Sequence, residues 1–253
     1  MTHSRSIFRI SGADRVHFLQ GLVTNDVTKL ADGAVYAAML TPQGKLLADF
    51  ILVAENDAIL LDVAEPLAAG LFKRLSMYKL RADVGIEKTR LVLSRGLGKA
   101  PAGAVSDPRH PALGWRSYGT TVTSEIDPAD WQALRVAHLI PETGTELLPD
   151  GTFILEAGFE RLNGVDFRKG CYVGQEVTAR MKHKTELRKG LTRVTVEGSA
   201  PSGTEITANG KPAGTLFTQS GGFGIAYLRF DRAKGALQAG DATLHWTGAN
   251  QDA

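Results

Sequence analysis

The segment RKGCYVGQEVTARMKHK, residues 168–184, contains the one cysteine of the chain, Cys171. Arg168 and Lys169 come just before it, and neighbouring positive charge favours the thiolate, the form that acts as a nucleophile or a metal ligand. Glycines on either side of the thiol allow the main chain to approach a ligand closely or to adopt a positive φ. The segment therefore predicts a thiol that does chemistry or contacts a ligand.

Three roles for Cys171 fit this pattern. A nucleophilic Cys–His pair needs a histidine nearby in space, and His183 is the nearest in sequence, but no cysteine-protease signature is present. Zinc sites and iron–sulfur clusters usually take several cysteines or clustered histidines, so the chain alone predicts no metal site. A cluster held by Cys171 would have to be shared with a second chain or an external thiol. The third role is that of a small residue in a tight turn.

Positive charge gathers around the cysteine. Residues 168–193 contain eight lysines and arginines against two glutamates, a local charge of +6 in a chain whose net charge is +2. Such a run is either a solvated face or a surface that attracts an anion: nucleic acid, phosphate or a polycarboxylate. Its position around the odd cysteine favours a ligand.

The composition is that of a soluble globular protein. Of 253 residues, 43% are hydrophobic and 22% are charged. No apolar run approaches the roughly 18–20 residues of a membrane span, and the start of the chain lacks the apolar core of a signal peptide. One cysteine cannot form an internal disulfide, which suits a reducing compartment. We therefore expect a cytoplasmic protein without a membrane contact.

Hydrophobic periodicity predicts an α+β fold for the first part of the chain, with helices on one face of a mainly antiparallel sheet. Asp127 is expected to cap a helix, and residues 96–111, rich in glycine and proline, are expected to form a loop. The expected strands cover 6–10, 34–40, 45–54, 58–64 and 84–94, and the expected helices cover 12–23, 65–80 and 127–140.

The pattern changes after residue 186. Short apolar-alternating runs separated by glycine turns predict a small all-β barrel or sandwich. We therefore expect two regions, an α+β region over 1–185 and a small β-barrel over 186–253.

The octapeptide KGCYVGQE, residues 169–176, resembles the signature of the YgfZ-type folate-binding proteins. These proteins are relatives of the glycine-cleavage T-protein and take part in iron–sulfur cluster metabolism. The resemblance continues through residues 18–27, 41–50 and 154–170 and through GTLFTQ and GFGIAYLR near the end of the chain. It implies a cloverleaf of interlaced ferredoxin-like α+β subdomains around a central folate channel, followed by a C-terminal β-barrel. It also implies tetrahydrofolate as the cofactor.

The same resemblance suggests residues for the folate site. Glu156 would lie against the pterin, where a carboxylate can accept two hydrogen bonds from the amino group and the ring N–H. Asn25 and Asp26 would lie at a turn near the ligand. The basic side chains after the motif would meet the anionic, often polyglutamylated tail of the folate. The remaining expected ligand-binding or cysteine-orienting residues are Lys169, Tyr172, Gln175, Glu176, Arg180, Lys182 and Lys184.

One segment departs from the T-protein pattern. T-proteins carry two adjacent aspartates where this chain reads KLLADF, with Ala48 and a remaining Asp49. This difference favours a folate-binding accessory protein that supports assembly or repair of iron–sulfur enzymes, including those that methylthiolate tRNA, with Cys171 as its essential residue. The alternative is a folate-dependent aminomethyl or methyl transferase with Asp49 as proton shuttle. Folate and iron–sulfur enzymes or assembly proteins are the expected partners. Direct binding of nucleic acid is not expected, because no RNA-binding signature is present.

Overall fold

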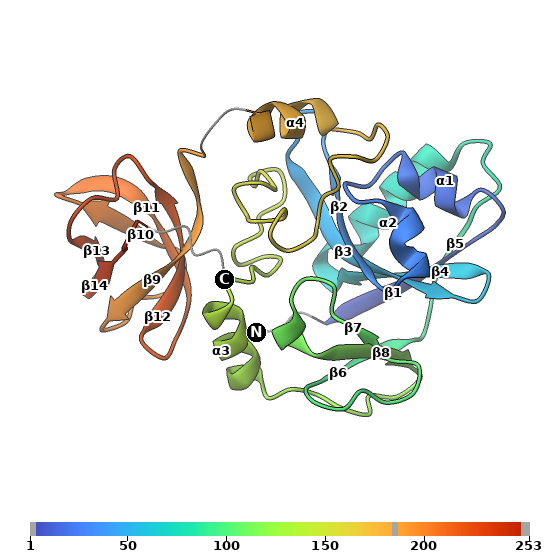
Figure 1. Ribbon diagram of the computed structural model, residues 1–253, viewed down its shortest axis with the longest axis horizontal. Helices are drawn as coiled ribbons and strands as arrows, with labels where there is room; N and C mark the ends of the chain where they lie inside the picture. Colours follow the sequence, from blue (N-terminus) through green and yellow to red (C-terminus); the bar gives the residue numbers. More distant parts are fainter. Residues whose placement is uncertain (1–3, 184–186, 249–253) are drawn as a thin grey trace.

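The computed structural model describes residues 4–183 and 187–248 (Figure 1). An α+β part with two sheets makes up most of the molecule, and a closed β-barrel lies beside it. The expected α+β front and all-β tail are confirmed. The expected boundary between residues 185 and 186 lies outside the described residues.

The first sheet has five antiparallel strands in the order β2-β3-β4-β1-β5. Every residue of the edge strand β2 and of the central strand β4 is buried, so both faces of the sheet are covered at these two strands. Asn56 takes a positive φ in the tight turn between β3 and β4, as expected for the hairpin. The strands are β1 Arg5–Ser11, β2 Val35–Leu40, β3 Leu46–Glu55, β4 Ala58–Ala64 and β5 Gly85–Lys88.

Helical segments cover one face of this sheet. Leu19 and Leu71 pack with sheet residues in one hydrophobic cluster. The first helix begins later than the predicted 12–23, because Gly12 takes a φ of 99° and packs against the carbonyl group of Asp83. Within the described residues, no helix is long and apolar enough to cross a membrane. The segments are α1 Arg15–Gln20, the 3-10 helix η1 Val27–Ala31 and α2 Glu65–Lys79.

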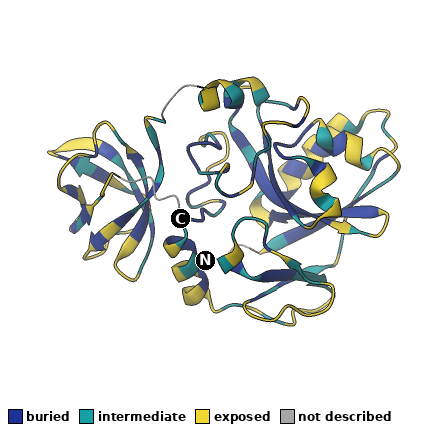
Figure 2. Ribbon diagram, in the orientation of Figure 1, coloured by how far each residue is buried: buried dark blue, intermediate teal, exposed yellow. Residues whose placement is uncertain are grey.

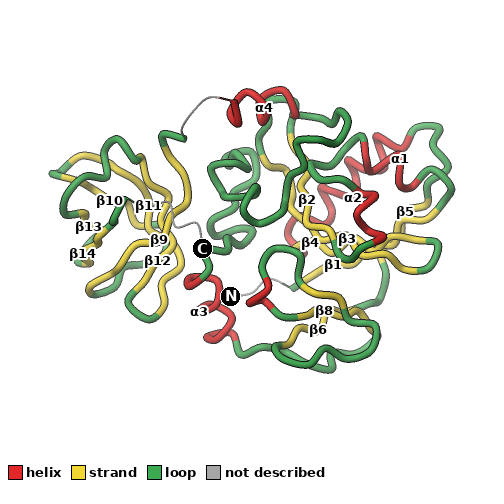
Figure 3. Tube along the Cα trace, in the orientation of Figure 1, coloured by secondary structure: helices red, strands yellow, loops and turns green. Residues whose placement is uncertain are grey.

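A second sheet and a long coil cover the opposite face. The segment 84–94, expected to complete one series of strands, is divided, since β5 joins the first sheet and β6 the second. Residues 96–111, expected as a loop, contain the short strand β7. The coil over 138–174, which Figure 3 shows as loop, packs Phe159 and Leu162 into a second hydrophobic cluster. The second sheet, in the order β6-β8-β7, comprises β6 Val92–Gly96, β7 Val105–Ser106 and β8 Trp115–Gly119, with the 3-10 helix η2 Pro111–Leu113 before β8.

The barrel closes six strands in the order β10-β11-β12-β9-β14-β13 around an apolar interior, and Figure 2 shows these strands lined by buried residues. Helix α3, Pro128–Ala137, packs against β11, and Gln132 on it donates to the carbonyl of Gln219 at 2.7 Å. Asp127 caps α3 by accepting from the N–H of Ala129, as predicted. The barrel strands are β9 Lys189–Glu197, β10 Thr204–Ala208, β11 Lys211–Ser220, β12 Phe223–Arg229, β13 Leu237–Ala239 and β14 Ala242–His245.

Candidate functional site

The cysteine motif begins with a buried lysine. The ammonium group of Lys169 donates hydrogen bonds to the carbonyl oxygens of Gln20 at 2.7 Å, the last residue of α1, and of Val23 at 2.5 Å. Burial lowers the pKa of Lys169 to about 8, while the carboxylates of Asp26 and Asp166 act in the opposite direction. A lysine expected to bind a ligand therefore joins the motif to the N-terminal part of the chain.

Asp166 holds the beginning of the cysteine loop, residues 166–174. Its Oδ1 accepts from the main-chain N–H groups of Arg168 at 2.7 Å and Lys169 at 3.3 Å, and its Oδ2 pairs with Lys29 at 2.7 Å. The hydrogen bond from Lys29 is the main cause that lowers the pKa of Asp166. The loop is thereby tied to η1.

Asn25 and Asp26 support the turn before η1. The amide of Asn25 donates to the carbonyl oxygens of Tyr36 at 2.8 Å and Asn163 at 2.6 Å. Asp26 accepts from the hydroxyl of Thr28 at 2.7 Å and from its N–H at 3.0 Å, and the hydroxyl is the main cause that lowers the pKa of Asp26. Both side chains have the local partners that such residues commonly find in turns. Their contact with a ligand stays a prediction.

The second half of the motif packs against the turn between β2 and β3. Tyr172 is buried, and its N–H donates to the side-chain oxygen of Gln175 at 3.3 Å, the first residue of α4, Gln175–His183. Gly174 has a φ of 82°, and a Cβ there would lie 2.5 Å from the carbonyl oxygen of Thr41. Glycine therefore fits this position, and a residue with a side chain would push the loop off the turn.

Cys171 is exposed on the cysteine loop. Lys169 before it and Tyr172 after it are both buried. No hydrogen bond from the thiol to any other described residue is present. The motif therefore holds its main chain in place through the neighbours of the cysteine and leaves the thiol itself open to solvent.

The basic side chains of α4 are exposed and ion-paired. Arg180 pairs with Glu176 one turn earlier at 2.6 Å, and Lys182 pairs with Glu160. Exposed pairs of this kind contribute little to stability, so an anionic ligand can replace the glutamate in either pair. Lys184, expected beside them, lies outside the described residues.

Glu156 lies in a cleft of about 320 Å³ between the coil and the barrel, here the barrel cleft. Its Oε2 accepts from the hydroxyl of Tyr227 at 2.7 Å, and its Oε1 lies 3.7 Å from the Nζ of Lys189. Burial and the bond to Glu156 raise the pKa of Tyr227, which keeps that hydroxyl a donor. The cleft is lined by Glu146, Glu156, Lys189, Leu191, Phe217 and Tyr227 among others.

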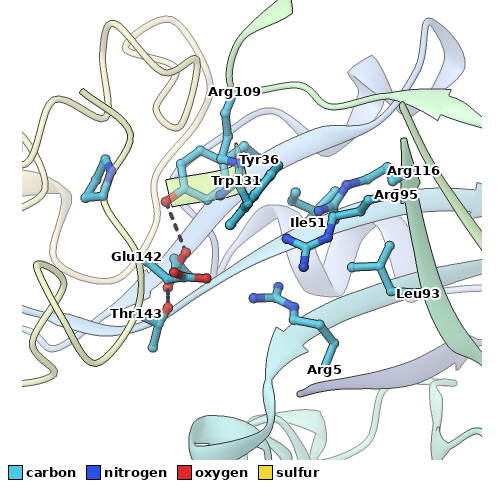
Figure 4. Close-up of a pocket in the computed structure, with 12 residues that line it drawn as sticks. Arg5, Tyr36, Ile51, Leu93, Arg95, Arg109, Arg116, Trp131, Glu142 and Thr143 are labelled. Carbon is cyan, nitrogen blue, oxygen red and sulfur yellow. Dashed lines mark hydrogen bonds between the residues drawn. The ribbon is translucent and has the colours of Figure 1, made fainter. Parts of the chain in front are cut away.

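Asp49 lines a second cavity, here the arginine cavity, between the two sheets and α3 (Figure 4). Its carboxylate accepts from the hydroxyls of Tyr36 at 3.1 Å and of Thr143. Burial, followed by the charge of Asp49, raises the pKa of Tyr36. The cavity has a volume of about 20 Å³, far below that of the barrel cleft. Its charged and aromatic lining comprises Arg5, Arg95, Arg109, Arg116, Trp131 and Glu142 together with Tyr36 and Asp49.

A buried ion-pair network divides the two cavities. Arg135 pairs with Glu142 at 2.9 Å and with Glu146 at 2.6 Å. Glu142 lines the arginine cavity and Glu146 lines the barrel cleft. The two carboxylates predicted for the folate site and for proton transfer, Glu156 and Asp49, therefore lie in different cavities.

The cysteine loop and α4 lie apart from both cavities, since neither Cys171 nor Arg180 lines the barrel cleft or the arginine cavity.

Sequence reasoning missed most of the residues that line the two cavities. Tyr227 and Lys189 come from barrel strands, and the arginines come from distant strands and loops, so no motif joins them. The one local signal is an arginine inside a short apolar strand, as at Arg95 in RLVLSRG.

Comparison with known sequences shows similarity over nearly the whole chain. Residues 188–250 match the family model described as CAF17, C-terminal beta-barrel domain. The chain is 31% identical over 282 residues to the mitochondrial iron–sulfur cluster assembly factor IBA57 of Mus musculus, covering 92% of this chain and 78% of that protein. The Homo sapiens factor gives 31% over 280 residues with the same two shares. A Neurospora crassa homolog is 32% identical over 246 residues, covering 82% of this chain and 55% of that protein.

Comparison with solved structures supports the fold. The crystal structure of glycine cleavage system aminomethyltransferase T from Bartonella henselae matches with a TM-score of 0.72, covering 96% of this chain and 84% of that chain. The sequence identity is 14%, so this likeness shows the fold alone. The expected fold class, a T-protein-like α+β fold with a C-terminal barrel, is confirmed.

The comparisons refine one expectation and overturn another. The sequence relatives are iron–sulfur cluster assembly factors, as expected, but they carry the name IBA57 and not YgfZ. The expected cytoplasmic location is wrong, because these relatives are named as mitochondrial. The expectation used a single cysteine and the lack of an apolar signal core, and neither feature separates the cytoplasm from another reducing compartment.

Proposed function

We propose a role in iron–sulfur cluster assembly for this protein, because the chain belongs to the family of the iron–sulfur cluster assembly factor IBA57. One observation supports Cys171 as the residue responsible for this role. The cysteine loop is anchored through Lys169 and Tyr172, while Cys171 itself is exposed. We also propose the mitochondrion as its compartment, because these relatives are named as mitochondrial.

The exposed thiol suits contact with a cluster that passes between proteins. Cysteine thiolates are the usual ligands of iron–sulfur clusters. Within the described part of the chain, no group of three or more histidine, cysteine and acidic residues could hold a metal ion. We therefore treat the cluster as a substrate, with Cys171 supplying one ligand and a partner assembly protein or an external thiol supplying the others. The clients we propose are iron–sulfur enzymes, including those that methylthiolate tRNA.

Tetrahydrofolate is the proposed cofactor, and the barrel cleft is its proposed site. The volume of about 320 Å³ is in the range of small-molecule sites, whereas the arginine cavity of about 20 Å³ is too small for a pterin. Glu156 keeps acceptor capacity beyond its bond from Tyr227 and suits the amino and N–H groups of a pterin. Phe217 offers an apolar surface on which the pterin ring can pack.

The role of Cys171 is tested in cells that lack this protein, by measuring the activity of an iron–sulfur enzyme. The native protein should restore that activity, whereas Cys171→Ala should not, although both should unfold at the same temperature. Cys171→Ser separates the need for a sulfur ligand from the need for a small polar side chain. Full restoration by Cys171→Ala would refute the role.

The folate site is tested by calorimetric titration of tetrahydrofolate under reducing conditions. Glu156→Gln should weaken binding by about tenfold or more, because it removes a charged acceptor. Glu205→Gln is the matched control, since Glu205 is exposed on barrel strand β10 and lines neither the barrel cleft nor the cavity beside it. Equal binding by native protein and Glu156→Gln, or no saturable binding at all, would contradict a pterin site at Glu156.

A further inference from the structure

The arginine cavity contains a guanidinium group that is in direct contact with no carboxylate among the described residues. Arg95 on β6 stacks over Trp131, with its Cζ 4.2 Å from the ring centroid. Among the described residues, no hydrogen bond or ion pair to the Arg95 side chain is present, although each of its arginine neighbours in the cavity has a carboxylate partner. Burial, followed by the charges of Arg116 and Arg109, lowers the pKa of Arg95 to about 10, while the charge of Glu142 acts in the opposite direction. Arg95 therefore has no carboxylate in direct contact, although Glu142 acts on it from a distance.

Two further N–H donors at this cavity lack acceptors. The Nε1 of Trp131 and the Nε of Arg116 are buried, and neither has a hydrogen-bond partner among the described residues. Trp131 and Arg116 are 3% and 2% exposed, and both line the cavity. A buried donor without an acceptor has lost its hydrogen bonds to water and gained none in the protein, so such groups in a folded protein call for a missing partner.

The neighbouring carboxylates have other partners. Asp62 binds Arg5 at 2.6 Å and Arg116 at 2.7 Å. Asp107 binds Arg109 at 2.8 Å and Arg116 at 3.3 Å. Three arginines thus share two aspartates, and the charge of Asp49 also acts on Arg109.

Two other carboxylates face the cavity. Asp49 accepts from the hydroxyls of Tyr36 and Thr143, and Glu142 pairs with Arg135, which lies on the side of the barrel cleft. A bound anion would therefore lie toward Arg95 and away from these two carboxylates. Figure 4 shows Arg95 and Arg5 on the side opposite Glu142 and Thr143.

We propose that the arginine cavity binds a small oxyanion, a carboxylate or phosphate group, which accepts hydrogen bonds from Arg95 and from the unpartnered N–H groups of Trp131 and Arg116. The small volume admits one such group, and the half-buried position of Arg95 leaves the remainder of the ligand outside. Planar guanidinium groups recognise both carboxylate and phosphate through paired N–H donors. This site lies beyond the proposed folate site, because the network of Arg135 separates the two cavities.

The test titrates inorganic phosphate and glutarate separately into the full-length protein by calorimetry, at constant ionic strength with chloride as the background ion. At least one of the two should bind with a stoichiometry of one and quench or shift tryptophan fluorescence, since Trp131 lies in the cavity. Arg95→Gln should weaken that binding by about tenfold or more. Arg90→Gln is the matched control, because Arg90 is an exposed arginine outside the cavity, and it should bind as the native protein does.

The pattern of binding identifies the source of the anion. Phosphate binding alone indicates a phosphorylated ligand, glutarate binding alone indicates a carboxylate ligand, and binding of both supports a general oxyanion site. Glu156→Gln should leave this binding unchanged, so failure of the folate proposal and failure of this one can be distinguished. The inference is overturned if neither anion binds the native protein up to about 10 mM, or if Arg95→Gln binds as tightly as the native protein.

Discussion

The ammonium group of Lys169 lies 2.7 Å from the carbonyl oxygen of Gln20, a residue 149 positions earlier in the chain. A second bond joins it to the carbonyl oxygen of Val23 at 2.5 Å. These two bonds connect the cysteine loop to the end of α1, and they explain why a lysine stands two residues before the exposed thiol of Cys171. In this position the lysine supports the loop and is not itself part of a charged surface.

Replacing Lys169 should destabilise the protein. Lys169→Met leaves the carbonyls of Gln20 and Val23 without their donor, so we expect the free energy of unfolding to fall by about 1–3 kcal/mol in urea denaturation. Lys182→Met is the control, because Lys182 is exposed and its ion pair contributes little. Equal losses in the two variants would argue against an anchoring role.

The same lysine predicts a pH dependence of stability. Burial holds its pKa at about 8 in the folded protein, below the value of 10.5 for a free lysine. Between these two pH values the unfolded chain binds more protons, so the contribution of Lys169 to the free energy of unfolding rises with pH. Urea denaturation of the native protein and Lys169→Met between pH 8 and 10.5 should show the native protein gaining relative to the variant. A difference that is constant or falls with pH would contradict this.

Gly174 should tolerate no side chain. Gly174→Ala places a Cβ 2.5 Å from the carbonyl oxygen of Thr41 at a φ of 82°, and we expect a loss of about 1–3 kcal/mol in the free energy of unfolding. Gly170→Ala is the matched control in the same loop, since a Cβ there would meet no atom within 4 Å. The control should change stability by less than about 1 kcal/mol. A larger effect at Gly170 than at Gly174 would show that the loop packs differently.

Asp62 should be essential for the region around the arginine cavity. Its fully buried carboxylate accepts from Arg5 at 2.6 Å, Arg116 at 2.7 Å and Tyr118 at 2.9 Å. Asp62→Asn leaves buried guanidinium charge uncompensated, so thermal and urea unfolding should show a loss of about 3–5 kcal/mol. Asp57→Asn, at an exposed turn position, should stay within about 0.5 kcal/mol of the native protein.

The loss of stability at acid pH provides a second test of the role of Asp62. Although burial acts to raise its pKa, the charges of Arg5 and Arg116 and the hydrogen bonds hold that pKa below the usual value of 3.8. The stabilisation is therefore present above pH 4 and lost as the pH falls through the pKa of the folded state. In Asp62→Asn the free energy of unfolding should depend less on pH below pH 4. An unchanged midpoint of acid unfolding would contradict the role given to the Asp62 carboxylate.

Much of the architecture follows from local patterns in the sequence. Alternating apolar residues and a tight turn at Asn56 specify the β3–β4 hairpin, Asp127 specifies the start of α3, and glycine-separated runs specify the barrel strands. The octapeptide around Cys171 marks the thiol as unusual, and its resemblance predicts a link to iron–sulfur clusters that the names of the sequence relatives share. These features depend on residues close together in the chain, where propensity, capping and turn chemistry act.

Tertiary structure alone decided which of these residues meet. It buried Lys169 against Gln20 and placed Glu156 and Asp49 in separate cavities. It also brought arginines from β1, β6, β8 and the loop before η2 around Trp131. No local pattern could predict these contacts, because they depend on the strand order, in which β6 pairs with β8 and not β5, and on the closure of the barrel against the coil.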